Sequence, residues 1–88
     1  MVDKVFTSQP RNTLPKLVAV WEDEKGRKIS DEKHVEFIFK NLAEVDAGTV
    51  NNFKECTKLS LSSNLIVKIP ELHLDHLEIL SLGRNKIK

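Results

Sequence analysis

The 88-residue sequence has little of what several protein classes require. Its single cysteine cannot form an internal disulfide, so a reducing compartment is the expected environment. No apolar run approaches the roughly 18 residues of a membrane-spanning helix, and residues 1–20 contain no apolar segment of the secretory kind. Lys and Arg number 14 and Asp and Glu 13, which gives no basic face for nucleic acid. We therefore expect neither nucleic acid nor a membrane as a partner.

Side chains arranged for catalysis are scarce as well. His73 and His76 lie close in sequence, but without a third His or a Cys beside them they make a poor zinc site. Gly83 is isolated, so no glycine-rich loop is available to cradle a phosphate. Cys56 takes an apolar position in the repeat described next and is expected to be a small buried side chain. The sequence predicts no enzyme, no metal site and no cofactor.

One pattern occurs twice, 21 residues apart: Leu59, Ser60, Leu61, Asn64 and Ile66 recur as Leu80, Ser81, Leu82, Asn85 and Ile87. Read from Cys56 and Leu77 it approaches L-x-x-L-x-L-x-x-N-x-I, the leucine-rich repeat, whose period is about 20–29 residues. Alternating leucines face one side of a short strand, and the asparagine amide can bond backbone groups where the strand turns. Stacked copies make a parallel sheet.

A weaker copy precedes these two. Its positions Val35, Phe37, Lys40, Leu42 and Val45 lie 24 residues before Leu59, Leu61, Asn64, Ile66 and Ile69, with lysine in place of the asparagine. Phe39 continues the alternation of Phe37, so a first strand is expected near residues 35–39, its register left open. A short helical turn should follow, with Asp46 as its N-cap.

The segment from Thr13 to Gly26 predicts a helix that covers the open end of the stack. Its apolar residues share one face, and they are Leu14, Leu17, Val18 and Trp21. Thr13 is expected to cap the start and Gly26 to end the helix in the left-handed conformation. A partner-binding helix is the alternative, whereas the acids at the helix end disfavour a lipid surface. As a cap, the helix would bury the Trp21 indole.

The predicted fold class is an α/β leucine-rich-repeat solenoid of about two to three coils, with an N-terminal capping helix and no C-terminal cap. Residues 1–12 are assigned to a flexible N-terminus, 13–33 to the helical cap and 34–88 to repeats. The chain stops at Lys88, so Leu80, Leu82 and Ile87 are expected to be covered on one side only. The expectation is a truncated form of a longer protein, or self-association through the uncapped end.

Non-core residues of the repeats point to a family. The stretches 56–64 and 79–88, together with Trp21-Glu22, Lys25-Gly26, Ser30 and Val45-Asp46-Ala47, resemble the leucine-rich-repeat light chains of axonemal outer-arm dynein. The resemblance covers residues 13–88. This sequence departs from the family pattern because its repeat is one residue shorter. It also lacks the family's further repeats and C-terminal helical cap.

The resemblance implies a non-catalytic subunit that binds a dynein heavy chain at its microtubule-binding region, with tubulin as a further partner. It implies the cytoplasm, the cytoskeleton and the axoneme of a cilium or flagellum as the location. From the strand alternation, the expected partner-binding residues on or beside the concave sheet are Lys58, Ser60, Ser62, Ile79, Ser81 and Arg84. The alternatives are a repeat protein that regulates a phosphatase, a truncated isoform with little function of its own, and strand residues that are merely solvated.

Overall fold

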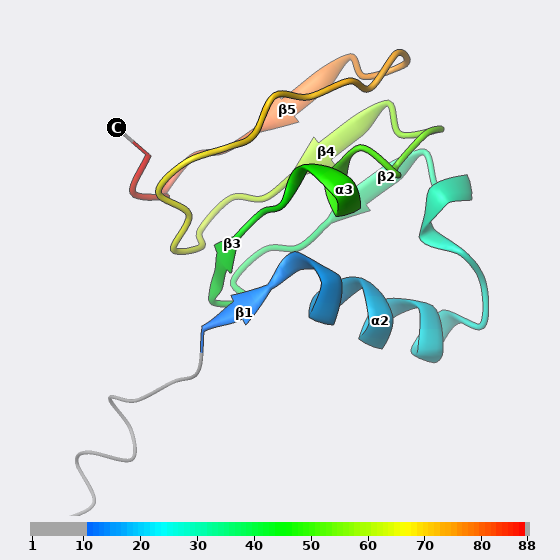
Figure 1. Cartoon of the computed structure of the whole chain (residues 1–88), viewed down its shortest axis with the longest axis horizontal. Helices are drawn as coiled ribbons and strands as arrows, with labels where there is room; N and C mark the ends of the chain where they lie inside the picture. Colours follow the sequence, from blue (N-terminus) through cyan, green and yellow to red (C-terminus); the bar gives the residue numbers. More distant parts are fainter. Residues whose placement is uncertain (1–10, 88) are drawn as a thin grey trace, which may run out of the picture.

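Three short parallel strands, one from each sequence repeat, form the sheet of this computed structural model, which describes residues 11–87 (Figure 1). The elements are β1 (Asn12–Thr13), α2 (Leu14–Lys25), the 3₁₀ turn η1 (Ile29–Asp31), β2 (His34–Glu36), β3 (Leu42–Glu44), α3 (Ala47–Val50), β4 (Lys58–Ser60) and β5 (Ile79–Ser81). The sheet order is β2-β4-β5, and β1 pairs with β3 in a separate two-stranded sheet. We call each of β2, β4 and β5, with the chain that returns from it, a coil.

The register of the sheet follows the spacing of the repeats. Leu59 pairs with Leu80, and Val35 pairs with Leu59. The 24-residue offset of the first copy is therefore confirmed. The expected extent of the first strand is wrong, because β2 ends at Glu36 and Phe39 turns away with a φ of 56° and 79% of its surface exposed.

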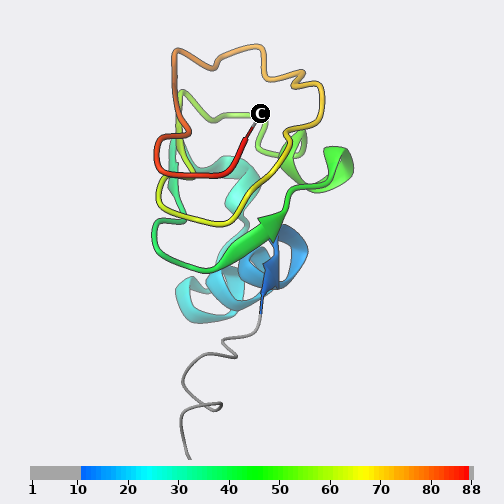
Figure 2. The ribbon, with the colours of Figure 1, turned by 90° about the vertical axis from the view of Figure 1, so that its left-hand side faces the viewer.

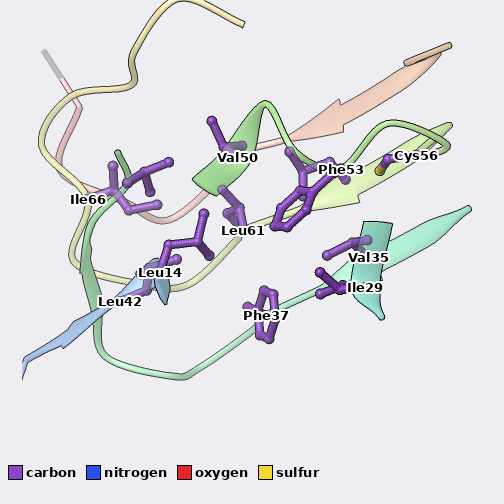
Figure 3. Packing of buried hydrophobic residues seen from close by; sticks show 12 residues of the cluster. Leu14, Ile29, Val35, Phe37, Leu42, Val50, Phe53, Cys56, Leu61 and Ile66 are labelled. Atoms are coloured by element: carbon purple, nitrogen blue, oxygen red, sulfur yellow. The ribbon is translucent and has the colours of Figure 1, made fainter. Parts of the chain in front are cut away.

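The core lies between the strands and the returning segments (Figure 3). Its buried members are Leu14, Ile29, Val35, Phe37, Leu42, Val45, Val50, Phe53, Cys56, Leu59, Leu61 and Ile66. Burial decreases toward β5, where Leu80 is 41% exposed although its neighbour Leu59 is 0% exposed. Ile87 is 40% exposed, so the half-covered state expected for the third coil is observed.

Two asparagines join the coils. Asn64 Oδ1 accepts hydrogen bonds from the backbone N–H groups of Lys40 (2.9 Å) and Leu42 (3.1 Å) in the preceding coil. One coil later, Asn85 Oδ1 accepts from the Ile66 N–H at 3.1 Å, and its Nδ2 donates to the Leu61 carbonyl at 2.9 Å. The asparagine in the turn after each later strand thus holds backbone groups of two coils together, as the sequence pattern predicts.

Helix α2 lies against the first coil (Figure 1). Gly26 ends it at a φ of 69°, with its N–H donating to the Glu22 carbonyl at 2.9 Å, which confirms the expected C-cap. Thr13 occupies the N-cap position but makes no side-chain capping bond, so that expectation is wrong. The indole of Trp21 is half-buried rather than buried, and the Arg27 guanidinium lies over its ring, 5.3 Å from the centroid.

The N-terminal boundary also differs from expectation. Asn12 falls in the expected flexible segment, yet it pairs in β1, with its N–H donating to the Asn41 carbonyl at 2.8 Å and Nδ2 to the Lys40 carbonyl at 2.6 Å. Residues 1–10 of that segment lie outside the described residues. In the first return, Asp46 caps α3 by accepting from the Thr49 N–H at 2.9 Å, as predicted.

Candidate partner-binding surface

The side of the sheet away from the core presents two rows of side chains, which we call the outer sheet face. Because the strands are parallel and in register, each row takes one residue per strand. The first row is His34, Lys58 and Ile79, and the second is Glu36, Ser60 and Ser81. Four of the six expected contact residues therefore stand together on this face: Lys58, Ser60, Ile79 and Ser81.

Charges on the outer sheet face are exposed and of both signs. Lys58 Nζ lies 3.8 Å from Glu36 Oε2, and their side chains are 41% and 52% exposed. A solvated pair of this kind contributes about 0–1 kcal/mol to stability. Both groups therefore remain available for a partner's charges at little cost.

Ser60, one of the expected contact residues, is less exposed than a contact residue on the surface of the sheet would be. It is only 6% exposed, because Glu36 stands beside it on one strand and Ser81 on the other. Ser62 is half-buried, with its Oγ 3.5 Å from Ser60 Oγ. Ser60 is therefore part of the floor of the face and offers little area for contact, whereas Ile79, 52% exposed, offers most.

Arg84 does not belong to the outer sheet face. It lies three residues beyond β5 in an exposed turn, with a φ of 58°. Phe39 occupies the corresponding turn position after β2, and sequence reasoning missed it as an exposed residue because its alternation with Phe37 favours a continued strand. The 24-residue offset that aligns Phe39 with Ser63 is the signal that could have placed it in a turn.

The described residues hold no arrangement suited to a metal or to thiol chemistry. Within residues 11–87 no group of three or more His, Cys, Asp or Glu side chains comes together. Cys56 is fully buried, its Sγ lies 3.2 Å from the Lys58 carbonyl, and burial raises the pKa of its thiol. None of the helices described is long and apolar enough to cross a bilayer.

Over 79 residues the chain is 42% identical to dynein axonemal light chain 1 of Xenopus laevis, 40% identical to that of Mus musculus and 35% identical to that of Chlamydomonas reinhardtii. The chain is a relative of these light chains. The matched part is 86% of this chain but only 41%, 41% and 39% of those proteins, so the chain spans about two-fifths of their length. No family model matches the sequence, and no solved structure does. The resemblance inferred from the non-core repeat residues is confirmed.

Proposed function

We propose that the chain is a leucine-rich-repeat binding module that acts as a light chain of an axonemal dynein, in the axoneme of a cilium or flagellum. Its relatives carry that name, and the match with them covers 86% of this chain. The partner under this proposal is a dynein heavy chain, with tubulin as a second candidate. The role is non-catalytic, and binding is the activity to be tested.

The in-register outer sheet face is the observation that carries the proposal. Its second row contains two small side chains side by side, Ser60 and Ser81, and its first row ends in the exposed Ile79. Small side chains let a partner helix approach the sheet closely, and an exposed apolar side chain beside them can anchor it. The exposed pair of Lys58 and Glu36 would form a polar rim.

A pull-down with the microtubule-binding region of an axonemal dynein heavy chain tests this function. The variant Ser81→Arg places a long charged side chain on the outer sheet face, in β5 beside Ser60. The matched control is Ser30→Arg, which makes the same change at another half-buried serine, in η1. We expect capture by the original chain and by Ser30→Arg, and loss of capture by Ser81→Arg.

Two comparators make the pull-down specific. A phosphatase catalytic subunit represents the main rival partner, and microtubule co-sedimentation tests tubulin directly. Circular dichroism of each variant shows whether it is folded. Capture of the phosphatase but not of the heavy chain, or equal capture of both serine variants by the heavy chain, would reject the proposal.

A further inference from the structure

The turns that follow the three strands share one backbone conformation. Three residues past the last residue of each strand, Phe39, Ser63 and Arg84 have φ values of 56°, 60° and 58°. Hydrogen bonds join the turns: the Ser63 N–H donates to the Gly83 carbonyl at 2.8 Å, and Asn64 Oδ1 accepts from the Lys40 N–H at 2.9 Å. We call these turns, residues 37–41, 61–65 and 82–87, the strand-end edge; Figure 2 shows them stacked and facing the viewer.

The side chains on this edge differ although the backbone repeats. A left-handed φ is costly for a bulky side chain, and asparagine or glycine adopts it more readily. Phe39 nevertheless stands there and leaves 79% of its surface in solvent, while Phe37 and Phe53 are in the core at 4% and 0% exposure. The fold therefore gains little burial from Phe39.

The charges on the strand-end edge are all of one sign. Lys40, Arg84 and Lys86 are exposed, and the three turns contain no Asp or Glu. Within residues 11–87 none of these cations forms an ion pair. Such a cluster of unpaired cations attracts anionic groups and speeds their association.

The opposite ends of the strands carry the reverse charge. We call residues 31–33, 54–57 and 75–78 the strand-start edge. Its acids are Asp31, Glu32, Glu55, Asp75 and Glu78, and its bases are Lys33 and Lys54. Although the net charge of the chain is near zero, positive and negative charges are therefore separated along the strand direction. The positive end is the one that carries the exposed Phe39.

A groove adjoins the strand-end edge, between α2 and the first turn. Its volume is about 290 Å³, and its lining includes Lys16, Val20, Trp21, Glu24, Phe37 and Lys40. Lys40 belongs to both the groove and the edge, and Val20 on the groove wall is 48% exposed. The groove thus offers an apolar site beside two lysines and one glutamate.

We propose that the strand-end edge binds an acidic segment of a partner protein that carries a large apolar side chain. Carboxylates of the segment pair with Lys40, Arg84 and Lys86, and the apolar side chain packs on Phe39 or in the groove. The first and third turns are about 10 Å apart, twice a strand spacing of about 4.8 Å, which an extended segment spans in about three residues. This surface is separate from the outer sheet face, so the inference stands or fails independently of the dynein proposal.

Fluorescence anisotropy with labelled synthetic peptides tests the inference on the intact 88-residue chain. The probe is a peptide of Glu and Leu, and the comparison probes replace Glu by Gln, replace Leu by Ser, or substitute a single-stranded DNA oligonucleotide. The double variant Lys40→Glu/Arg84→Glu removes cations from the strand-end edge. Lys33→Glu/Lys54→Glu makes the same change in net charge at the strand-start edge and is the matched control.

We expect the Glu-Leu peptide to bind the original chain and the control variant equally, and to bind the strand-end variant about tenfold or more weakly. Phe39→Asn, which suits the left-handed backbone, should weaken binding without unfolding the chain, as circular dichroism will show. Added salt should weaken binding because the pairs are exposed.

Five results would overturn the inference. The Glu-Leu peptide could fail to bind, or both double variants could weaken it alike, which would indicate only a general effect of net charge. Equal binding of the Gln-Leu peptide would show that the cations take no part. Equal binding of the Glu-Ser peptide or of the DNA would show a surface that accepts any polyanion and makes no use of Phe39.

Discussion

Replacing Asn64 by alanine should destabilise the chain severely. Asn64 is 6% exposed, and its Oδ1 accepts from the N–H groups of Lys40 and Leu42 in the preceding coil. Its Nδ2 donates to three backbone carbonyls: Phe37 at 2.7 Å, Leu61 at 2.9 Å and Ser62 at 3.1 Å. One amide therefore satisfies backbone groups on two coils.

The cost can be worked out from which of these groups stays buried after truncation. The Lys40 N–H lies in an exposed turn, and the Leu61 carbonyl also accepts from Asn85, so both keep or find another partner. The Leu42 N–H and the Phe37 carbonyl belong to residues that are 0% and 4% exposed. Each buried group that loses its partner costs about 1–3 kcal/mol, so the loss of two partners in Asn64→Ala should cost about 2–6 kcal/mol in unfolding free energy. That is a large share of the roughly 5–15 kcal/mol typical of a folded domain.

Asn51→Ala is the matched control, because Asn51 also bridges to a later return segment. Its Nδ2 donates to the Glu71 carbonyl at 3.1 Å, and its Oδ1 accepts from the His73 N–H at 2.6 Å. Both bonds are exposed, so water can replace the lost partner, and the expected cost is about 0.5–1.5 kcal/mol. Urea unfolding followed by circular dichroism measures both variants. Equal losses of unfolding free energy would refute the reasoning from burial.

Gly26 has a left-handed φ of 69° and Gly83 does not, while both have open space at the Cβ position. Gly26→Ala should therefore cost about 1 kcal/mol and Gly83→Ala nothing, and equal urea midpoints would contradict this. Trp21→Ala should cost clearly less than the roughly 3–5 kcal/mol of a buried aromatic, because the indole is half-buried; a thermal unfolding loss in that range would show that it is core. Amides of residues 79–84 should exchange with deuterium faster than those of 58–63 in a dilute monomer, because β5 pairs on one side only, and equal protection would refute this.

The spacing of leucines and asparagines was sufficient to predict how the coils stack. A strand has a side-chain period of two, so placing Leu59 beside Leu80 also determines which side chains face the core. The buried apolar residues of the second coil, Leu59, Leu61 and Ile66, follow directly from that pattern. Asn64 is buried as well, because its amide is fully used by backbone groups, which a repeated asparagine at a turn indicates.

Features that depend on a neighbouring coil were not accessible from the local sequence. Phe39 continues the alternation of Phe37, and the strand ends before it because the Asn64 side chain of the next coil holds the Lys40 N–H in a turn. The burial of Ser60 likewise comes from the strands on both sides of it, not from its own character. β1 forms because Asn12 finds backbone partners in the turn that follows β2. Each of these depends on a contact between residues at least 21 apart, which a local pattern does not encode.

The lysine at position 40, where later coils have asparagine, has a physical explanation. Asn64 and Asn85 each accept N–H groups of the coil before them, and in the described residues no coil precedes the first. An asparagine at position 40 would lack those donors, and Asn12 of β1 instead reaches the Lys40 carbonyl from the side of the capping helix. The side chain of residue 40 is therefore not needed to hold the stack together. A lysine can occupy this turn and direct its charge to solvent, where it adds to the cations of the strand-end edge.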